Sequence, residues 1–351
     1  MNLQDQLDIN RRNVSFDNYD ITVRQLYSMI AEKQIELQPE YQRHFVWDST
    51  RQSQLIESIF LGIPVPNLFM ATNSDSTWEV IDGLQRLTTI VNFIGDEDVR
   101  LRTNANTQKL RIVGLDKVSN MNGAYFEDLP MSVQHMFMTR PIRITVLNDK
   151  SDFSVRYDLF ERLNTGGVIL HPQEIRNCVF IGEFKDFLTE CSENHAFLNS
   201  VKMSENAERT GNREELVLKF FAYFEDRDLF IHSVKEFLND FMEKKTKRLI
   251  NKGELRDLFN ETFHIINELL PMGIVRGNRV NNTPLVLFEA ISVGVADLVV
   301  NNERNLVTAA KLQALLNNEE LRRLTTGATN SRVKLNERIE FVKNYIRQDA
   351  I

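Results

Sequence analysis

The chain has 351 residues, of which 42% are hydrophobic and 26% charged, and its formal net charge is −7. This length has room for two domains with separate cores, and the composition is ordinary for a globular protein. No run of the sequence approaches the ~20 apolar residues of a membrane span. The acidic balance argues against wholesale coating of nucleic acid, which requires a basic surface.

The first residues and the cysteines indicate the compartment. The N-terminal segment 1–6 is polar and lacks the basic start and apolar stretch of a signal peptide. Two cysteines, Cys178 and Cys191, are too few for a disulfide framework or a four-ligand zinc site. We therefore expect a cytoplasmic protein without a membrane association.

The first half of the chain predicts a small sheet. Residues 1–20 are polar, and we expect them to form a poorly ordered or loosely docked arm. Residues 96–122 are rich in Asp, Asn, Thr and Gly and predict a long loop or an edge insertion, of the length often used for lids or binding segments. Short strand patterns lie at residues 34–37, 67–71, 77–81 and 142–147, with helices between them, among them 23–32.

Beyond residue 150 the apolar periodicity becomes helical. Pro172 suits the first position of a helix, where Glu174 favours the positive end of the dipole. Further helices are predicted at residues 214–224, 234–242, 255–270, 283–300, 306–316 and 334–346. The sequence thus predicts an α+β fold, in which a small mixed sheet with flanking helices (residues 21–180) is followed by a mainly helical domain (181–351).

The most informative run is IDGLQRLT at residues 81–88, between a strand pattern and a helix pattern. A strand, a glycine turn and a helix N-terminus offer free backbone N–H groups and a positive dipole end to an anion. Arg86 adds a forked cation suited to phosphate, and Asp82 adds a carboxylate that can hold a metal, polarise a water or orient Arg86. The local alternative is a capped turn with an exposed arginine, because Asp-Gly is common turn chemistry.

Further motifs stand in order around this run: QPEYQRHFVW at 38–47, VPNLFM at 65–70, FERLNTG at 160–166 and QEIRN at 173–177. Together they resemble the family of GmrSD N-terminal domains, in which the central motif is usually Asp-Gly-Gln-Gln-Arg; Leu84 stands here where the first Gln often is. The resemblance implies a ParB/sulfiredoxin-like core that binds and often hydrolyses a nucleoside triphosphate. It also implies a role in bacterial defence against foreign or modified DNA.

These motifs define a candidate site. We expect Asp82, Gln85 and Arg86 to be catalytic, acting on a nucleoside triphosphate held with Mg²⁺, with Gln85 orienting a water or a phosphate oxygen. The candidates for nucleotide binding are Tyr41, Gln42, Arg43, Gly83, Thr88, Arg162, Asn164 and Arg176. One cleft should bring together distant members of the set, namely Arg43, Asp82, Arg86 and Asn164.

Several of these residues also have a structural interpretation. Tyr41 and Trp47 suit core aromatics, with Arg43 reaching solvent along an apolar surface. The functional alternative is that Arg43 is a second phosphate ligand beside an aromatic on which a base stacks. Asn164 suits an ordinary helix stop, and Arg176 can pair with Glu174 or Asp82 instead of a ligand.

Two basic stretches are candidates for local DNA contact, and a solvated helix face is the simpler interpretation of each. Their candidate residues are Lys244, Lys245, Lys247 and Arg248 in the first stretch, and Arg332 and Lys334 in the second. No metal site is assigned, because the six histidines are scattered and no HNH, His-Glu-x-x-His or Walker-type motif is present.

We therefore expect a protein that binds and hydrolyses a nucleoside triphosphate in a bacterial restriction or anti-phage system. Fused relatives carry an HNH nuclease domain whose signature is missing after residue 180, so a separately encoded nuclease is an expected partner, with nucleotide, DNA and self-association also open. Two alternatives remain. One is a non-enzymatic module that senses DNA or nucleotide and signals to a nuclease; the other is a ParB-like nuclease that acts directly on DNA.

Overall fold

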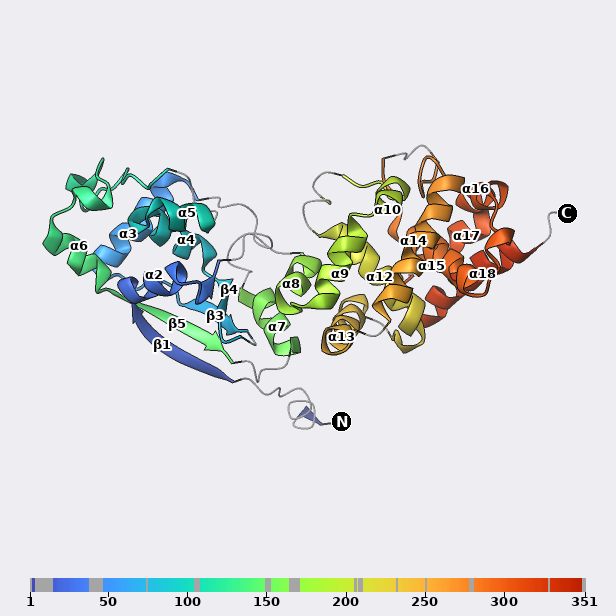
Figure 1. Ribbon diagram of the computed structural model, residues 1–351, viewed down its shortest axis with the longest axis horizontal. Helices are drawn as coiled ribbons and strands as arrows, with labels where there is room; N and C mark the ends of the chain where they lie inside the picture. The colour runs from blue at the N-terminus through green and yellow to red at the C-terminus, as the bar shows by residue number, and fades with distance from the viewer. Residues whose placement is uncertain are drawn as a thin grey trace. The chain divides into compact units, whose positions relative to one another are not determined.

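The chain folds as two compact units, residues 1–170 and 171–351. The computed structural model describes residues 2–3, 15–37, 47–73, 75–103, 108–148, 153–163, 171–204, 207, 211–231, 233–249, 251–277, 281–327 and 329–348 (Figure 1).

A five-stranded mixed sheet forms the first unit, in the order β1-β5-β3-β4-β2. The edge strand β1 (Phe16–Thr22) runs antiparallel to β5 (Pro141–Leu147), which runs parallel to β3 (Leu68–Thr72). Next, β3 runs antiparallel to β4 (Trp78–Asp82), and β4 runs parallel to β2 (Ile35–Glu36). The strands predicted from apolar runs are therefore confirmed.

Strand β1 corrects one expectation. We expected residues 1–20 to be a polar arm, but Phe16–Thr22 pair along their whole length with β5. The cross-strand contacts are polar: the Arg143 guanidinium donates to the Asp20 carboxylate at 2.7 and 2.8 Å, and Thr145 Oγ1 donates to Asn18 Oδ1 at 2.8 Å. Such pairs stabilise a strand without leaving an alternating apolar pattern in its sequence.

The main core of this unit lies on one face of the sheet. Apolar side chains of the helices pack there against Leu68, Met70 and Val146, which alternate with residues of the other face. A cluster of phenylalanines, among them Phe93 and Phe137 with ring centroids 5.4 Å apart, fills its centre. The helices are α2 (Val23–Ala31), α3 (Ser49–Leu61), α4 (Leu84–Ile94), α5 (Glu97–Arg102) and α6 (Met131–Met138) (Figure 1).

The stretch at 96–122 contains more structure than a loop. It begins with α5, which Asp96 caps by accepting from the Val99 N–H at 2.9 Å, and it ends with the 3₁₀ turn η1 (Ser119–Met121). The described part between them is irregular, but Ile112 is fully buried in the main core. The segment is therefore anchored to the domain by its own side chains.

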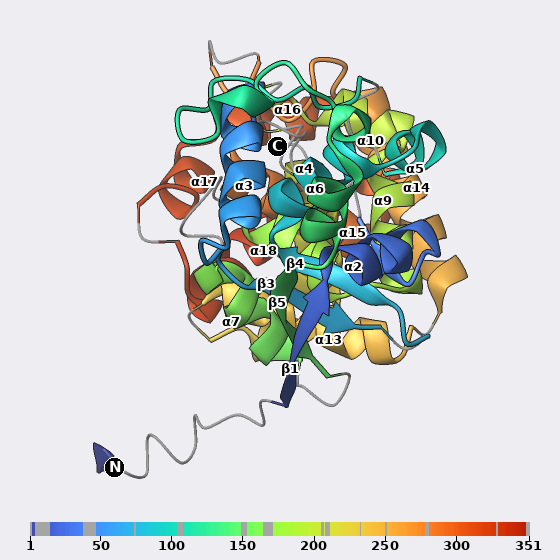
Figure 2. The same cartoon turned by 90° about the vertical axis from the view of Figure 1, so that its left-hand side faces the viewer.

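Helix α7 (Phe153–Leu163) packs against β4 on the other face of the sheet (Figure 2). Its Tyr157 and Phe160 are buried, as are Ile81 and Ala71 of the strands beneath.

The described part of the second unit is helical. Helix α15 is mainly apolar and lies in contact with α12, α14 and α18, as expected of a helix buried in a bundle. The predicted helices are confirmed, while the short α9, α10 and α17 were not predicted. The helices are α8 (Pro172–Val179), α9 (Glu183–Ser192), α10 (His195–Ser200), α12 (Asn212–Asp226), α13 (Val234–Lys247), α14 (Lys252–Leu269), α15 (Leu285–Val300), α16 (Ala309–Asn317), α17 (Glu319–Leu324) and α18 (Arg332–Arg347).

Candidate functional site

The turn between β4 and α4 has the strand–glycine–helix geometry that the sequence predicts. Asp82 ends the strand, Gly83 is the N-cap with φ +107°, and α4 begins at Leu84. A Cβ atom at position 83 would lie 2.3 Å from Leu68 Cδ2, so only glycine fits. No side chain caps α4, and the N–H groups of its first turn have no intrahelical acceptors. This turn is therefore suited to an anion.

Arg86 differs from the exposed arginine of the local alternative. Its Nη2 donates to Asp82 Oδ2 at 2.5 Å, and its Nη1 donates to the carbonyl oxygens of Pro66 at 2.5 Å and Asn67 at 2.9 Å. Its side chain is only 12% exposed, against 32% for Asp82. In this arrangement Arg86 fastens the β4–α4 turn to the segment that leads into β3, and Asp82 is the more accessible of the pair.

A short chain of hydrogen bonds connects Gln85 with α3. Its Oε1 accepts from the Trp47 backbone N–H at 3.4 Å, and the Trp47 carbonyl accepts from Gln52 Nε2 at 3.0 Å. Gln52 Oε1 in turn accepts from Asn92 Nδ2 at 3.1 Å. Thr88, by contrast, is only 3% exposed, which favours a structural role, and its contact with a nucleotide stays a prediction.

Of the four residues predicted to lie in one cleft, only Asp82 and Arg86 are among the described residues. Tyr41, Gln42, Arg43 and Asn164 lie outside the described residues. The two remaining members, Asp82 and Arg86, are in direct contact. Arg162 is exposed on the last turn of α7.

Arg176 belongs to the interior of the second unit. It is 1% exposed, and its guanidinium donates to Asn239 Oδ1 at 2.8 Å, Gln173 Oε1 at 3.0 Å and Glu215 Oε2 at 3.1 Å. Its ion pair within the second unit is therefore with Glu215, and its contact with a nucleotide stays a prediction.

Glu79 is a residue that the sequence analysis missed. It lies on β4 close to the turn and is 3% exposed, and its Oε1 has no hydrogen-bond partner. Burial raises the pKa of Glu79 to about 8; the nearby Arg156 opposes this shift and Glu36 adds to it. Arg156 itself donates through Nη2 to the Thr72 carbonyl at 3.0 Å, while its Nε is unpartnered. A glutamate inside the apolar run WEVI was the available signal.

The first basic stretch is largely paired with acids. Lys245 is 6% exposed and ion-paired with Glu225 at 2.6 Å, which favours a structural role, and its contact with DNA stays a prediction. The more exposed Lys244 pairs with Asp226 and Lys247 with Glu243, each at 2.6 Å. Arg248 is exposed, and the bond described for it is the one that its backbone N–H donates to the Lys244 carbonyl.

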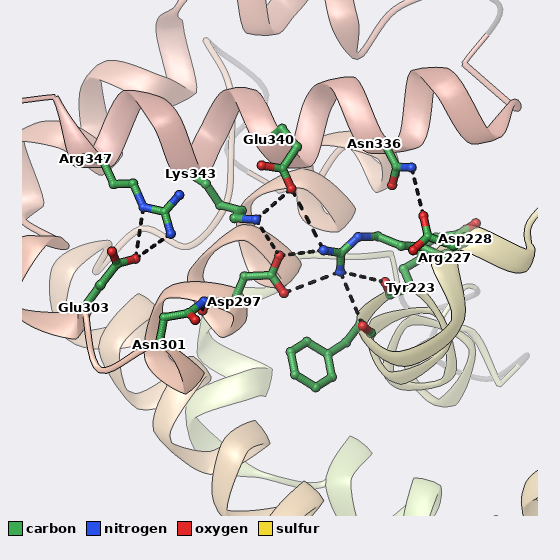
Figure 3. A network of polar contacts seen from close by, with 11 residues as sticks. Tyr223, Arg227, Asp228, Asp297, Asn301, Glu303, Asn336, Glu340, Lys343 and Arg347 are labelled. Carbon is green, nitrogen blue, oxygen red and sulfur yellow. Dashed lines mark hydrogen bonds and ion pairs between the residues drawn. The ribbon is translucent and has the colours of Figure 1, made fainter.

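The basic helix α18 is likewise matched by acids (Figure 3). Lys343 bridges Asp297 at 3.2 Å and Glu340 at 2.7 Å, and Asp297 also accepts from Arg227 at 2.8 Å. Of the two residues predicted to contact DNA, Lys334 pairs with Glu337 at 2.6 Å, and Arg332 Nη1 donates to the Asp228 carbonyl at 3.2 Å. Both stretches thus carry much less uncompensated charge than their sequences suggest.

Metal-binding clusters and membrane-spanning helices are both missing from the described ranges. No group of three or more His, Cys, Asp or Glu side chains there could hold a metal ion. No helix there is long and apolar enough to cross a membrane.

Comparisons with known proteins bear on the N-terminal half of the chain. Residues 23–181 match the family model of the GmrSD restriction endonuclease, N-terminal domain. This part of the chain is similar to the GmrSD N-terminal domain family. The match runs from α2 through α8 and includes Glu79, the Asp82 turn and α7.

Comparisons with solved structures and with curated sequences do not extend the family match. A solved structure, the C2221 form of a Pnob8-like ParB-N domain, covers 96% of this chain and 99% of its own, at 11% sequence identity and a TM-score of 0.23. A likeness at that score decides nothing about this protein. No curated protein sequence matches the chain.

Proposed function

We propose that this chain is a nucleotide-dependent component of a bacterial restriction or defence system. Its GmrSD N-terminal domain binds a nucleoside triphosphate with Mg²⁺ at the Asp82 turn and hydrolyses it, and a separately encoded nuclease cuts the DNA. One observation carries the proposal: the Asp82–Arg86 segment, which lies within the range of the family match, forms an uncapped strand–glycine–helix turn.

The residues of the turn divide the chemistry between them. The N–H groups at the start of α4 receive phosphate oxygens, while Arg86 keeps the turn in shape through Asp82 and two carbonyls. Asp82 Oδ1 has no hydrogen bond within the described part of the chain. One free carboxylate oxygen fits Mg²⁺, which proteins often bind through one or two carboxylates plus substrate phosphates.

Hydrolysis then needs a positioned water. Water attacks the terminal phosphorus, the bond to the bridging oxygen breaks, and Gln85 orients the attacking water through its side-chain amide. The hydrogen bond between the Trp47 N–H and Gln85 Oε1 fixes that amide relative to α3.

A second candidate function, nucleotide sensing without hydrolysis, has one observation in its favour. The Arg86 guanidinium already donates to one carboxylate and two carbonyl oxygens. An arginine held in this way contributes little to the charge that develops in a transition state unless these bonds break.

Phosphate release from the four ribonucleoside triphosphates with Mg²⁺, and thermal shifts with the same ligands, test the proposal on the full chain. A ligand at a hundred times its Kd should add about 2.7 kcal/mol of stability. Asp82→Asn should lower phosphate release at least tenfold. Asp20→Asn is the matched control, because Asp20 also pairs with an arginine but is exposed on β1.

Three outcomes would redirect the proposal. Stabilisation by a nucleotide without phosphate release identifies the sensing module. Mg²⁺-dependent cleavage of plasmid that is lost in Asp82→Asn identifies a nuclease. The absence of any nucleotide effect on the folded wild-type chain overturns both nucleotide-based functions.

A further inference from the structure

A pocket of about 680 Å³ opens on the first unit, beside the first turns of α3. Its walls come from α3 and from the described segment between α5 and η2 (Phe126–Asp128). The volume lies within the range of small-molecule sites. Its polar and aromatic lining residues are Ser49, Gln52, Gln108, Lys109, Arg111 and Tyr125; Asp82, Gly83 and Arg86 do not line it.

Arg111 is the cation that this pocket leaves available. Its Nε donates to the Gly123 carbonyl at 2.7 Å, which fixes the guanidinium, and its terminal nitrogens have no hydrogen bond among the described residues. The neighbouring acids are already engaged: Glu127 pairs with Lys109, and Asp48 caps α3 by accepting from the Arg51 N–H at 2.7 Å. A fixed, unneutralised guanidinium is suited to a phosphate group.

The other lining residues are suited to a nucleobase. The side chain of Tyr125 offers an aromatic ring on a residue that is 40% exposed, and every base has a face that stacks on such a ring. Gln108 is exposed and offers an amide, and Ser49 a hydroxyl, for the edge of a base. We infer that this pocket binds a nucleotide, with its phosphate on Arg111 and its base against Tyr125.

A chain of hydrogen bonds connects the pocket with the motif at the Asp82 turn. Gln52 lines it and donates to the Trp47 carbonyl, and the Trp47 N–H donates to Gln85. A ligand that shifts the first turn of α3 therefore acts on the side chain that positions water at the Asp82 turn. Nucleotide binding at this pocket does not depend on hydrolysis at the Asp82 turn, whereas a regulatory role for it rests on the proposed function.

Isothermal titration of the full chain with ATP, AMP and inorganic phosphate tests the inference, in Arg111→Ala, Arg111→Lys, Tyr125→Leu and Asp82→Asn variants. Arg111→Ala should weaken AMP binding at least tenfold, because AMP lacks the terminal phosphates proposed for the Asp82 turn, and Arg111→Lys should recover part of it. Tyr125→Leu should weaken AMP binding severalfold but leave phosphate binding unchanged. Asp82→Asn should leave AMP binding unchanged, which separates this site from the proposed function.

Lys117→Ala is the matched control, because Lys117 is an exposed cation of the same segment that does not line the pocket. Photo-crosslinking with an azido-AMP should label the peptide that contains Tyr125, which keeps the inference testable if a variant fails to fold. Tighter, Arg111-dependent binding of a short single-stranded oligonucleotide would support the same contacts with a nucleic-acid strand as their source. AMP binding equal in wild type and Arg111→Ala, or lost only in Asp82→Asn, would overturn the inference.

Discussion

Two desolvated glutamates, the buried Glu79 of the first unit and the half-buried Glu215 of the second, behave in opposite ways. Glu79 in the first unit has an unpartnered oxygen, and its pKa is raised to about 8 by burial. Glu215 in the second unit is also strongly desolvated, yet its pKa is lowered, because Lys219 and Arg176 both pair with it. The same side chain is thus neutral at pH 7 in one environment and charged in the other.

The difference is between a network of ion-paired charges and a buried carboxyl group with an unpartnered oxygen. The helical unit links its buried charges into chains, such as Glu215–Lys219–Glu289–Arg338. In the described sheet unit, Glu79 is buried on β4 and its Oε1 has no hydrogen-bond partner. A buried carboxyl group with a strongly raised pKa occurs at functional sites more often than elsewhere, so Glu79 makes the first unit a candidate for chemistry.

The largest expected effect is on the buried chain of the second unit. Glu289→Ala should lower the free energy of unfolding by about 3–5 kcal/mol, because it leaves the guanidinium of Arg338 and the ammonium of Lys219 buried without their carboxylate. Circular dichroism at 222 nm with denaturant measures it. Trp47 and Trp78, the two tryptophans, both lie in the first unit, so their fluorescence transition should move much less.

Glu320→Ala is the control for that change. Glu320 pairs with Arg323 on an exposed surface, where such pairs contribute about 0–1 kcal/mol. A loss for Glu289→Ala as small as that of the control would show that the buried chain is not a stabilising scaffold.

The next effect is a pH dependence of the first unit. Between pH 5 and 8 the folded state keeps a proton on Glu79 that the unfolded state has lost, because the pKa is about 8 when folded and near 4.5 otherwise. The free energy of unfolding should therefore fall as pH rises, by about 2–4 kcal/mol over this range. Denaturant unfolding followed by tryptophan fluorescence at pH 5, 6.5 and 8 measures the slope.

Glu79→Gln should remove most of that slope. Glu36→Gln should reduce it, because the Glu36 carboxylate adds to the raised pKa of Glu79. A wild-type first unit whose stability rises from pH 5 to pH 8 would contradict the neutral state of Glu79.

Apolar periodicity accounted for much of the fold. Short apolar runs predicted β2 to β5, and apolar residues at helical spacing predicted the long helices of the second unit. Both signals are local, because an element that buries one face repeats apolar residues along its own sequence. Strand β1 was not predicted, because its stabilising partners, such as Arg143 for Asp20, lie 123 residues away in the sequence. The strand–glycine–helix turn was predicted because it too is local.

Side-chain partners were the part that sequence could not supply. Arg86, Arg176 and Lys245 were correctly seen as cations, but what neutralises a cation depends on packing between elements. Glu215 is 39 residues from Arg176, and Glu225 is 20 residues from Lys245. A basic stretch read from sequence is therefore a poor guide to a basic surface.

A smaller effect concerns Gly83. Gly83→Ala should lower the stability of the first unit by about 1–3 kcal/mol, because its Cβ meets Leu68 Cδ2 and its φ of +107° is unfavourable for alanine. Tryptophan fluorescence measures the change. Gly277→Ala is the control, followed by circular dichroism at 222 nm because Gly277 lies in the second unit: its φ is +61° but nothing lies within 4 Å, so it reports backbone strain alone. Equal losses in the two variants would show that Leu68 yields without cost.

The smallest effect distinguishes a surface cation from a buried one in the first basic stretch. Arg248→Ala should change the free energy of unfolding by less than about 0.5 kcal/mol, because the residue is exposed. If the stretch touches DNA, the same change reduces the salt slope of binding by about one phosphate contact.

Lys245→Ala should instead lower stability by about 1–3 kcal/mol, because Glu225 loses its buried partner. Its salt slope should stay unchanged, because an ammonium enclosed by Glu225 and the Phe241 ring cannot reach a phosphate. A salt slope that falls equally in both variants, measured by fluorescence anisotropy of labelled DNA, would show that Lys245 leaves its partner on binding and that the two cations act as one surface.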